Sequence, residues 1–299
     1  MEYNDVARFS ALFGGRNDAV FDGAVARRRK PTFAIFDDHL SGRIDGIGTY
    51  PIREDNRCKW GCIDLDGAEY TFERTLDVYA CWQYYSITAW IERSRSKGWH
   101  LWTFASEWIS AETMRYAGLQ VIKLAKLPES TEVNPKQTTL APGQIGNTVR
   151  LPYPGNSNWQ RQVVLEPSSA LVLSLPDFLS CAMGARSPAT AFDVPAGIYR
   201  QALLTERRTE RYSSLLSKST SLPGSTRNQE AYKVLTGAMR VSINRDNQLF
   251  TVANLMHGLA MPYDEALTRM EEIWKHQVDQ SHDFYSLNTA LAKVKRAYK

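Results

Sequence analysis

The segment Trp60-Gly-Cys-Ile-Asp-Leu-Asp66 contains the pattern on which the expected fold depends. Apolar and acidic residues alternate in its second half, so Ile63 and Leu65 would point to one side of an extended chain. Asp64 and Asp66 would then share the opposite side. The alternation predicts a strand with two carboxylates on one face. The alternative interpretation is a strand that simply ends in an acidic turn.

Further short elements are expected after this strand. Residues 72–85 have a helical pattern, and residues 87–92 and 99–104 predict two strands that flank a polar turn. Ser110 is a predicted N-cap of a helix that ends before Pro128. A loop rich in Gly and Pro then separates two extended pieces, at 131–134 and 147–151.

The two aspartates are candidate metal ligands. Carboxylates at positions i and i+2 of a strand lie on one side of it, and their repulsion would raise a pKa unless cations neutralise the pair. Hard oxygen ligands suit Mg²⁺ or Mn²⁺, which combine one or two carboxylates with substrate phosphates. The residue types at Asp64 and Asp66 therefore favour a divalent cation.

A basic turn, Arg93-Ser-Arg-Ser-Lys-Gly98, follows later in the sequence. It combines cationic side chains and hydroxyl groups with a glycine that permits close approach of the backbone, and this combination suits a polyphosphate. His100 begins the next strand and would donate to a phosphate. The alternatives are a solvated basic hairpin turn and a structural histidine.

The overall composition is that of an ordinary globular protein. The chain has 299 residues, which favours two domains. Hydrophobic residues make up 43% and charged residues 23%, which excludes disordered and fibrous classes. The net charge of +4 permits an anionic partner. The sequence contains neither an apolar run of about 18 residues nor an export signal at its start, so we expect a soluble, cytoplasmic protein without a membrane partner.

The cysteines predict no disulfide framework, because the four of them are few and irregularly spaced. A zinc site formed by Cys58, Cys62 and Cys81 is an alternative. However, Cys62 falls inside the expected strand and the sequence has no CxxC pair. Buried thiols are the favoured interpretation.

The character of the sequence changes near residue 206. Residues 206–229 are rich in Ser, Thr, Arg and Gly and are expected to form a linker. Beyond it, apolar residues recur at helical spacing, as in Ala266, Met270 and Ile273. The sequence therefore predicts an α+β domain at 1–205 and a small all-helical domain at 230–299.

Taken together, the motifs resemble those of a known family. The resembling pieces are HLSGRIDGIGTYPI at 39–52, WGCIDLD at 60–66, ERSRSKGWHLWTF at 92–104 and EVNPKQTTLAPGQIGNTVRLPYPG at 132–155. In this order they are similar to the archaeo-eukaryotic primase superfamily, specifically to the primase-polymerases of phages, plasmids and mobile elements. Its members have a hydrophobic strand ending in DxD, a turn rich in Ser and Gly that leads to His, and a third acidic residue.

The resemblance implies roles for these residues. Asp64, Asp66 and Glu132 would be the metal ligands for Mg²⁺ or Mn²⁺, with Glu129 as the alternative to Glu132. His100 would complete the catalytic set. The incoming nucleotide would be bound by residues of the basic turn and the following strand, namely Ser94, Arg95, Ser96, Lys97 and His100.

Three further residues, Lys136, Gln137 and Asn147, match a stretch found in phage-type members. Lys136 would contact template or nucleotide, whereas for Asn147 such a contact and a part in loop structure both remain open. Several aromatic residues are candidates for stacking on template bases, with burial in the core favoured for each: Trp99, Trp108 and Tyr50.

The implied fold is α+β, with an RRM-like catalytic sheet, accessory N-terminal α/β elements and a small all-helical C-terminal domain. The domain at 1–205 would be a DNA primase or DNA-directed polymerase of a bacterial or phage-infected cell. It would make or extend primers on single-stranded DNA from dNTPs or NTPs by a two-metal-ion mechanism in DNA replication. The sequence has no GxxxxGK[ST] motif, so a replicative helicase would lie in a longer chain or act in trans.

Two other functions remain open at this point. A metal-dependent nuclease would also need clustered carboxylates and a histidine, but it would make little use of the basic turn. A non-catalytic single-stranded DNA-binding module for replication would use the turn and the tryptophans and leave the acids without a role. The choice between dNTPs and NTPs, de novo priming or extension, template preference and oligomeric state are not encoded in any motif.

Overall fold

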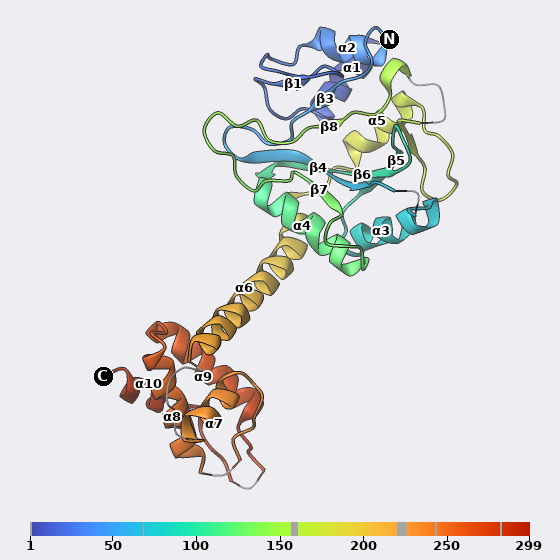
Figure 1. Cartoon of the computed structure of the whole chain (residues 1–299). Coiled ribbons are helices and arrows are strands. Elements are labelled where there is room, and N and C mark those ends of the chain that lie inside the picture. The colour runs from blue at the N-terminus through green and yellow to red at the C-terminus, as the bar shows by residue number, and fades with distance from the viewer. Residues whose placement is uncertain (1, 68, 157–160, 220–225, 243, 282) are drawn as a thin grey trace. The chain divides into compact units, whose positions relative to one another are not determined.

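The computed structural model describes residues 2–67, 69–156, 161–219, 226–242, 244–281 and 283–299 (Figure 1). The chain divides into two compact units, Met1–Leu203 and Leu204–Lys299. The first unit contains both β-sheets, and each unit has a hydrophobic core of its own. The architecture is a mixed α/β one with two antiparallel sheets, so the predicted combination of strands and helices is confirmed.

A five-stranded antiparallel sheet forms the centre of the first unit. The acidic segment ends the long strand β4, as its alternation predicts. The strands predicted near residues 87–92, 99–104 and 131–134 are also present. In spatial order the strands are β7 (Glu132–Asn134), β4 (Arg57–Leu65), β6 (Trp99–Ser110), β5 (Ala89–Arg93) and β9 (Val163–Leu165).

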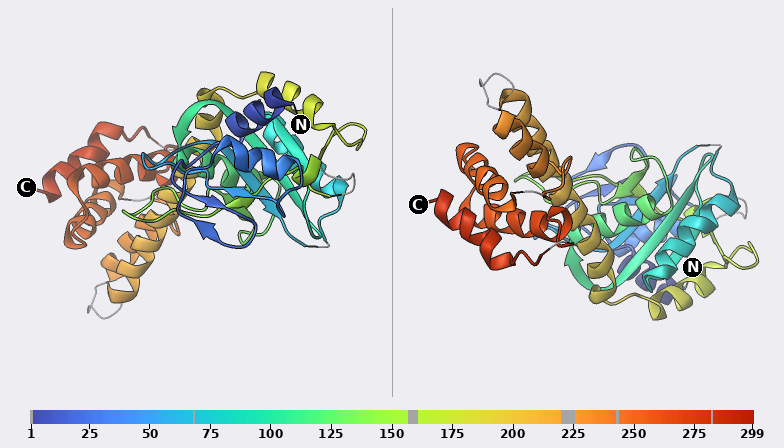
Figure 2. Two further views of the ribbon diagram at one scale, coloured as in Figure 1. Left: turned by 90° about the horizontal axis from the view of Figure 1, so that it is seen from above. Right: turned by 90° about the horizontal axis from the view of Figure 1, so that it is seen from below.

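Two helices, α3 (Phe72–Tyr84) and α4 (Ala111–Leu124), cover one face of this sheet (Figure 2). The side chain of Ser110 accepts a hydrogen bond from the backbone N of Thr113, so the predicted N-cap of α4 is confirmed. The chain order β4-α3-β5-β6-α4-β7 is that of a split β-α-β fold. It places β4 and β6, which are far apart in sequence, side by side in the middle of the sheet.

The opposite face is covered by the N-terminal elements and by α5 (Figure 1). A smaller antiparallel sheet lies on this side, with its strands in the order β2-β1-β3-β8. The strands of this sheet are β1 (Val20–Phe21), β2 (Ala26–Arg27), β3 (Gly48–Thr49) and β8 (Val149–Arg150). The accompanying helices are α1 (Tyr3–Leu12), α2 (Phe33–Leu40), the 3₁₀ turn η1 (Pro154–Asn156) and α5 (Leu175–Gly184).

An aromatic cluster joins these covering elements to the central sheet. The ring of Phe13 meets Trp102 and Phe104 edge-on, with centroids 5.1 and 5.2 Å away. The backbone oxygen of Phe13 also accepts a hydrogen bond from Trp60 Nε1 at 3.1 Å. The cluster therefore closes one end of this sheet face to water.

The boundary between the two units falls within the long helix α6 (Ala189–Ser219). The linker expected at 206–229 is interrupted by helix, because α6 continues through Ser219 and α7 begins at Thr226. Residues 220–225 of the expected linker lie outside the described residues. The stretch 206–219 contains no Gly or Pro and several Glu, Arg and Leu residues, which favour a helix over a linker.

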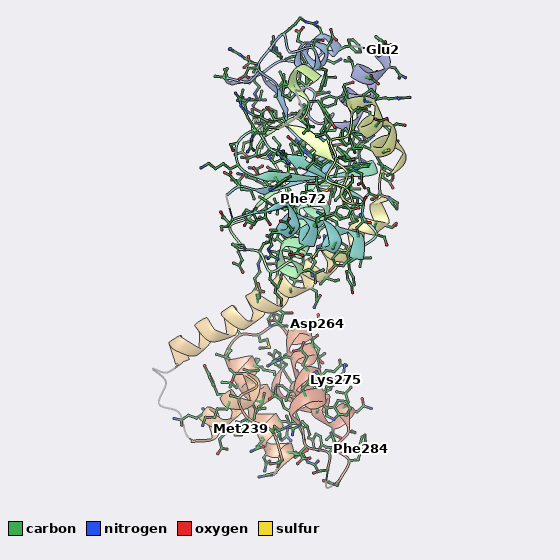
Figure 3. All side chains as sticks on the ribbon, turned by 90° about the vertical axis from the view of Figure 1, so that its right-hand side faces the viewer. Glu2, Phe72, Met239, Asp264, Lys275 and Phe284 are labelled. Carbon is green, nitrogen blue, oxygen red and sulfur yellow. The ribbon has the colours of Figure 1, made fainter. Side chains whose placement is uncertain are left out.

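The second unit is built from helices within the residues that the structure describes. Ala266, Met270 and Ile273 are fully buried in its core, as their spacing predicts. Met239 packs against this core, whereas Phe284 is 78% exposed (Figure 3). Its helices after α6 are α7 (Thr226–Leu235), α8 (Arg245–Gly258), α9 (Tyr263–Gln277) and α10 (Leu287–Ala297). Over the described parts of the chain, the helices are too short or too polar to cross a membrane.

Candidate active site

Titratable side chains form one row across the central sheet. Asp64 on β4 is paired in register with Glu132 on β7 and with His100 on β6. His100 is paired in turn with Glu92 on β5. Residues directly opposite each other in antiparallel strands share a face. The topology therefore gathers three acids and a histidine from four separate segments of the sequence.

The face of β4 changes from buried to open along its length. Trp60 and Cys62 are 0% and 2% exposed, whereas the side chain of Asp64 is 26% exposed. Asp66, just beyond the strand, is exposed. The open end is a pocket of about 200 Å³, and its lining includes six residues predicted from the sequence: Asp64, Asp66, Ser94, Arg95, Ser96 and His100.

The basic turn is held against the acidic end of β4. The backbone N of Ser94 donates to the oxygen of Gly98 at 3.0 Å, and the backbone N of Gly98 donates to Ser94 Oγ at 3.2 Å. A Cβ atom on Gly98 would lie 2.1 Å from the backbone oxygen of Leu65, so a larger residue would push the turn away. Because the hydroxyl of Ser94 accepts the hydrogen bond from Gly98, it stabilises the conformation of the turn.

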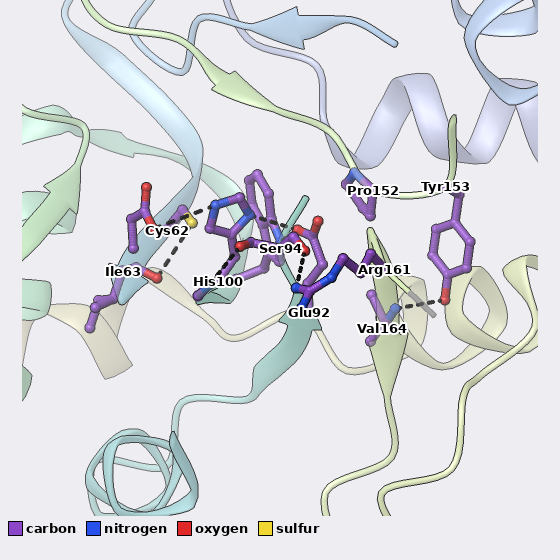
Figure 4. Close-up of polar contacts among 12 residues, drawn as sticks. Cys62, Ile63, Glu92, Ser94, His100, Pro152, Tyr153, Arg161 and Val164 are labelled. Atoms are coloured by element: carbon purple, nitrogen blue, oxygen red, sulfur yellow. Dashed lines mark hydrogen bonds and ion pairs between the residues drawn. The ribbon is translucent and has the colours of Figure 1, made fainter. Parts of the chain in front are cut away.

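His100 is buried between two carboxylates (Figure 4). Its Nδ1 lies 2.8 Å from Glu92 Oε2, and its Nε2 lies 3.6 Å from Asp64 Oδ1. Burial lowers the pKa of His100, but the two carboxylates outweigh this effect and raise the pKa to about 10. The imidazole is therefore a cation at neutral pH, with one N–H toward Glu92 and the other toward the acidic end of the pocket.

Two arginines, one from each sheet region, add positive charge to the pocket lining. Both terminal nitrogens of Arg95 lie 3.1 Å from Asp45 Oδ2. Arg150 on β8 donates to the backbone oxygen of Gly23 at 2.7 Å, and its guanidinium lies 5.1 Å from the centre of the Phe21 ring. Guanidinium groups in fixed positions suit phosphate oxygens.

The oxygen atoms of the pocket fit a hard divalent cation. Asp64 and Asp66 share the lining with Asn134, whose buried Oδ1 has no hydrogen-bond partner within the described ranges. Carboxylate and amide oxygens are ligands that Mg²⁺ and Mn²⁺ accept. The described residues contain no cluster of three or more His, Cys, Asp or Glu that could hold a metal by itself. The donor set thus fits a cation that takes further ligands from substrate phosphates or water.

Several predicted residues are outside the lining of this pocket. Glu132 lies opposite Asp64, but its Oε1 lies 2.6 Å from Lys136 Nζ, so the two form an ion pair. Lys97 is exposed at the tip of the turn. Asn147 Oδ1 accepts a hydrogen bond from Gln137 Nε2 within the loop. The structure therefore brings Asp64, Asp66 and three residues of the basic turn together. It leaves five residues that the sequence singled out outside the pocket lining: Lys97, Glu132, Lys136, Gln137 and Asn147.

The candidate stacking residues differ in exposure. Trp99 and Tyr50 are 8% and 3% exposed, so the expected burial in the core is confirmed for both. Trp108 is half-buried, with Arg53 and Lys59 at 4.5 and 5.0 Å from its ring centre. It therefore keeps partial exposure beside two cations.

The prediction of buried thiols is confirmed for two of the four cysteines, because Cys81 is half-buried and Cys181 is exposed. Cys58 and Cys62 are buried, and burial raises the pKa of both thiols. A buried protonated thiol is a poor metal ligand.

Six residues of the pocket lining were missed by the sequence reasoning: Glu92, Asn134, Thr148, Val149, Arg150 and Gln162. Glu92 gave a usable signal, because it is an acid next to Ile91 in a predicted strand. Strand alternation places it on the same side as Ser94. Asn134 and Arg150 lie at the ends of strands of only three and two residues, which are too short for a periodic pattern.

Comparisons with known proteins bear on the family of the first unit. No curated protein matches the chain. The crystal structure of primase RepB′ is similar at 12% sequence identity and a TM-score of 0.39, with 99% of this chain and 93% of that chain covered. A likeness at this score adds nothing to the assignment. Residues 25–166 match the family described as "TOTE conflict system, Archaeo-Eukaryotic Primase domain". The resemblance found in the sequence is thus confirmed: the chain carries a domain of the archaeo-eukaryotic primase superfamily over residues 25–166.

Proposed function

We propose that this protein is a template-directed nucleotidyltransferase, a DNA primase or primase-polymerase that acts on single-stranded DNA. One observation carries the proposal: in a primase-family domain, one pocket joins Asp64 and Asp66 to a basic turn and His100. Acidic and cationic groups facing one another suit a nucleoside triphosphate whose phosphates need both a metal and direct cationic contacts.

The cationic and hydroxyl side chains of the pocket would bind the triphosphate of the nucleotide. Arg95 and the cationic His100 would hold the phosphates of a dNTP or NTP, because both present N–H donors at the pocket. Ser96, exposed in the turn, would add a hydroxyl donor. Holding the triphosphate in place supplies much of the rate in such reactions, since positioning and electrostatics dominate nucleotidyl transfer.

Asp64 and Asp66 would hold Mg²⁺ or Mn²⁺, with Asn134 as an additional oxygen donor. Glu132 is the proposed third carboxylate, and its side chain would then leave Lys136. Lys136 would in turn contact the template or nucleotide. Bound divalent cations, two in the proposed mechanism, neutralise phosphate charge and lower the pKa of the attacking hydroxyl.

We further propose that the five-stranded sheet is the RRM-like catalytic sheet of the superfamily. Its order β7-β4-β6-β5 and its chain order β4-α3-β5-β6-α4-β7 support this assignment. Residues 1–205 would form the catalytic domain, and the helices of residues 230–299 would form an accessory domain for primer initiation or for a helicase partner in DNA replication. The half-exposed Trp108 would stack on template bases.

The proposal is tested by incubating the protein with a single-stranded template, labelled dNTPs or NTPs, and Mg²⁺ or Mn²⁺, with and without a primer. We expect template-dependent products from the wild type and a loss of at least about 10³-fold for Asp64→Ala/Asp66→Ala, with template binding retained. Asp77→Ala is the matched control, because Asp77 is an exposed carboxylate on α3 that lies away from the pocket.

The competing functions give different outcomes in this assay. Shortening of the template strand that depends on Asp64 and Asp66 would show a nuclease instead. Template binding without incorporation under either metal would favour the non-catalytic DNA-binding module. Products formed without a primer would identify a primase, and products formed only with one would identify a polymerase.

A further inference from the structure

Glu92 is a carboxylate with no exposed surface in the middle of the central sheet. It sits on β5, between β6 and β9, where it is paired with His100 and Val164. A carboxylate buried this deeply is costly unless hydrogen bonds compensate it. Its presence beside the core residues Ala89 and Ile91 of the same strand therefore needs a reason.

Two donors converge on a single oxygen of Glu92. His100 Nδ1 lies 2.8 Å and Trp102 Nε1 lies 2.6 Å from Oε2. The other oxygen, Oε1, is buried with no hydrogen-bond partner in the described part of the chain, and Glu92 belongs to the pocket lining. Trp102 therefore fixes the carboxylate. The carboxylate in turn fixes one edge of the His100 ring (Figure 4).

The ring of His100 has little freedom in this arrangement. The rings of His100 and Trp102 meet edge-on, with centroids 5.6 Å apart and an angle of 88° between their planes. Because Nδ1 is held by Glu92, the opposite nitrogen must point the other way. Nε2 lies 3.6 Å from Asp64 Oδ1, at the acidic end of the pocket.

We propose that Glu92 is a positioning residue for the nucleotide site: its carboxylate, oriented by Trp102, holds Nδ1 of His100 so that Nε2 faces the phosphates of the incoming nucleotide. The inference rests on the proposed function, because it assigns His100 to nucleotide binding. Glu92 itself touches neither nucleotide nor metal in this proposal. Loss of a partner that orients a functional histidine in this way typically lowers affinity or activity about 10- to 100-fold.

The test compares Glu92→Gln and Glu92→Met with the wild type. The amide oxygen of glutamine accepts the same two hydrogen bonds without charge, whereas methionine fills the space and offers only a weakly accepting sulfur. We expect the KM for the nucleotide to rise about 10-fold in Glu92→Gln and about 100-fold in Glu92→Met. Glu107→Gln is the matched control, because Glu107 is exposed on β6 and should leave KM unchanged.

If Glu92 only stabilised the fold, its substitution would change kcat and KM in a different way. Loss of folded protein lowers the active fraction, and hence kcat per total protein, and leaves KM for the nucleotide unchanged. Trp102→Phe adds an independent check, since it keeps a ring and removes the indole donor that orients Glu92. A folded Glu92→Gln and a folded Trp102→Phe with wild-type KM would overturn the proposal.

A second readout needs no activity. In protein labelled with ¹⁵N-histidine, the hydrogen-bonded Nδ1 proton of His100 should be protected from exchange with water in the wild type, less so in Glu92→Gln, and not in Glu92→Met. Equal protection of this proton in all three proteins would show that Glu92 does not orient the ring of His100. If the wild type incorporates no nucleotide, the proposed function fails, and this signal alone decides whether Glu92 orients the ring.

Discussion

Two histidines of the first unit are buried almost equally and yet differ in charge. His39 on α2 is 0% exposed, and His100 on β6 is 8% exposed. His39 bonds only to backbone groups: its Nδ1 accepts from the N of Ile47 at 3.2 Å, and its Nε2 donates to the oxygen of Pro152 at 2.8 Å. His100 instead lies between two carboxylates.

The partners, and not the degree of burial, decide the charge of each ring. Burial lowers the pKa of His39 to about 4, because its bond to Pro152 offsets little of the desolvation. Glu92 and Asp64 outweigh the same desolvation at His100 and raise its pKa to about 10. His39 is therefore a neutral link between α2 and the small sheet, whereas His100 is a cation in the pocket.

The largest expected effect separates the two rings by function. His100→Gln should lower kcat/KM for nucleotide incorporation about 10²- to 10³-fold, because it removes a fixed cationic donor from the pocket. His39→Gln should change kcat/KM per folded protein no more than about 2-fold at pH 8, since its ring donates and accepts hydrogen bonds only with backbone groups and lies outside the pocket lining. Steady-state kinetics on both variants measure this, and equal losses would erase the distinction between the two regions.

A second prediction concerns the stability of the His39 region in acid. Its pKa is about 4 in the folded protein and near 6.5 when unfolded, so the unfolded chain binds the extra proton first. The contribution of the neutral His39 to the free energy of unfolding is complete above pH 6.5. It is lost as the pH falls toward 4, by up to about 3 kcal/mol. Urea unfolding at several pH values measures the effect.

His39→Gln isolates this contribution from the other titrating groups. The variant should be less stable than the wild type at pH 8, because it loses a buried hydrogen bond. The difference between the two proteins should narrow as the pH falls from 6.5 to 4. A difference that stays constant with pH would show that His39 is not held neutral by its surroundings.

The smallest effect is expected where the pocket meets water. Asp45 pairs with Arg95, but its side chain is 75% exposed, and such pairs contribute little. Asp45→Asn should free Arg95 for phosphate and lower the KM for the nucleotide by about 2- to 5-fold. A change as large as that of His100→Gln would mean that exposed charges govern this site as strongly as buried ones.

Local patterns predicted the elements that carry the site. The alternation around Asp64 and Asp66 and the N-cap at Ser110 are properties of neighbouring residues, so both could be predicted without the fold. The order of the motifs indicated the family that residues 25–166 match. The helix across 206–219 was missed, because a bias toward Ser and Thr in the whole segment 206–229 concealed the Glu, Arg and Leu residues within it.

The row of titratable side chains across the central sheet could not be predicted from local patterns. Glu92 becomes a partner of His100 only because β5 and β6 pair in one particular register, in which a shift by one residue would turn one of them to the other face. Asn134 and Arg150 reach the pocket from strands of three and two residues. Both extended pieces were predicted, but so short a strand has no periodic pattern that shows which side chains face the pocket.

The sequence by itself determined that two carboxylates share a strand face and that a basic turn precedes a histidine, because neighbouring side chains follow the alternation of an extended chain. Only the tertiary structure decided which end of that face is closed by Phe13 and which is open as the pocket. It also decided that His100 is charged and His39 is neutral. The physical reason is that burial and charge depend on groups brought together by long-range strand pairing, and no local pattern records those partners.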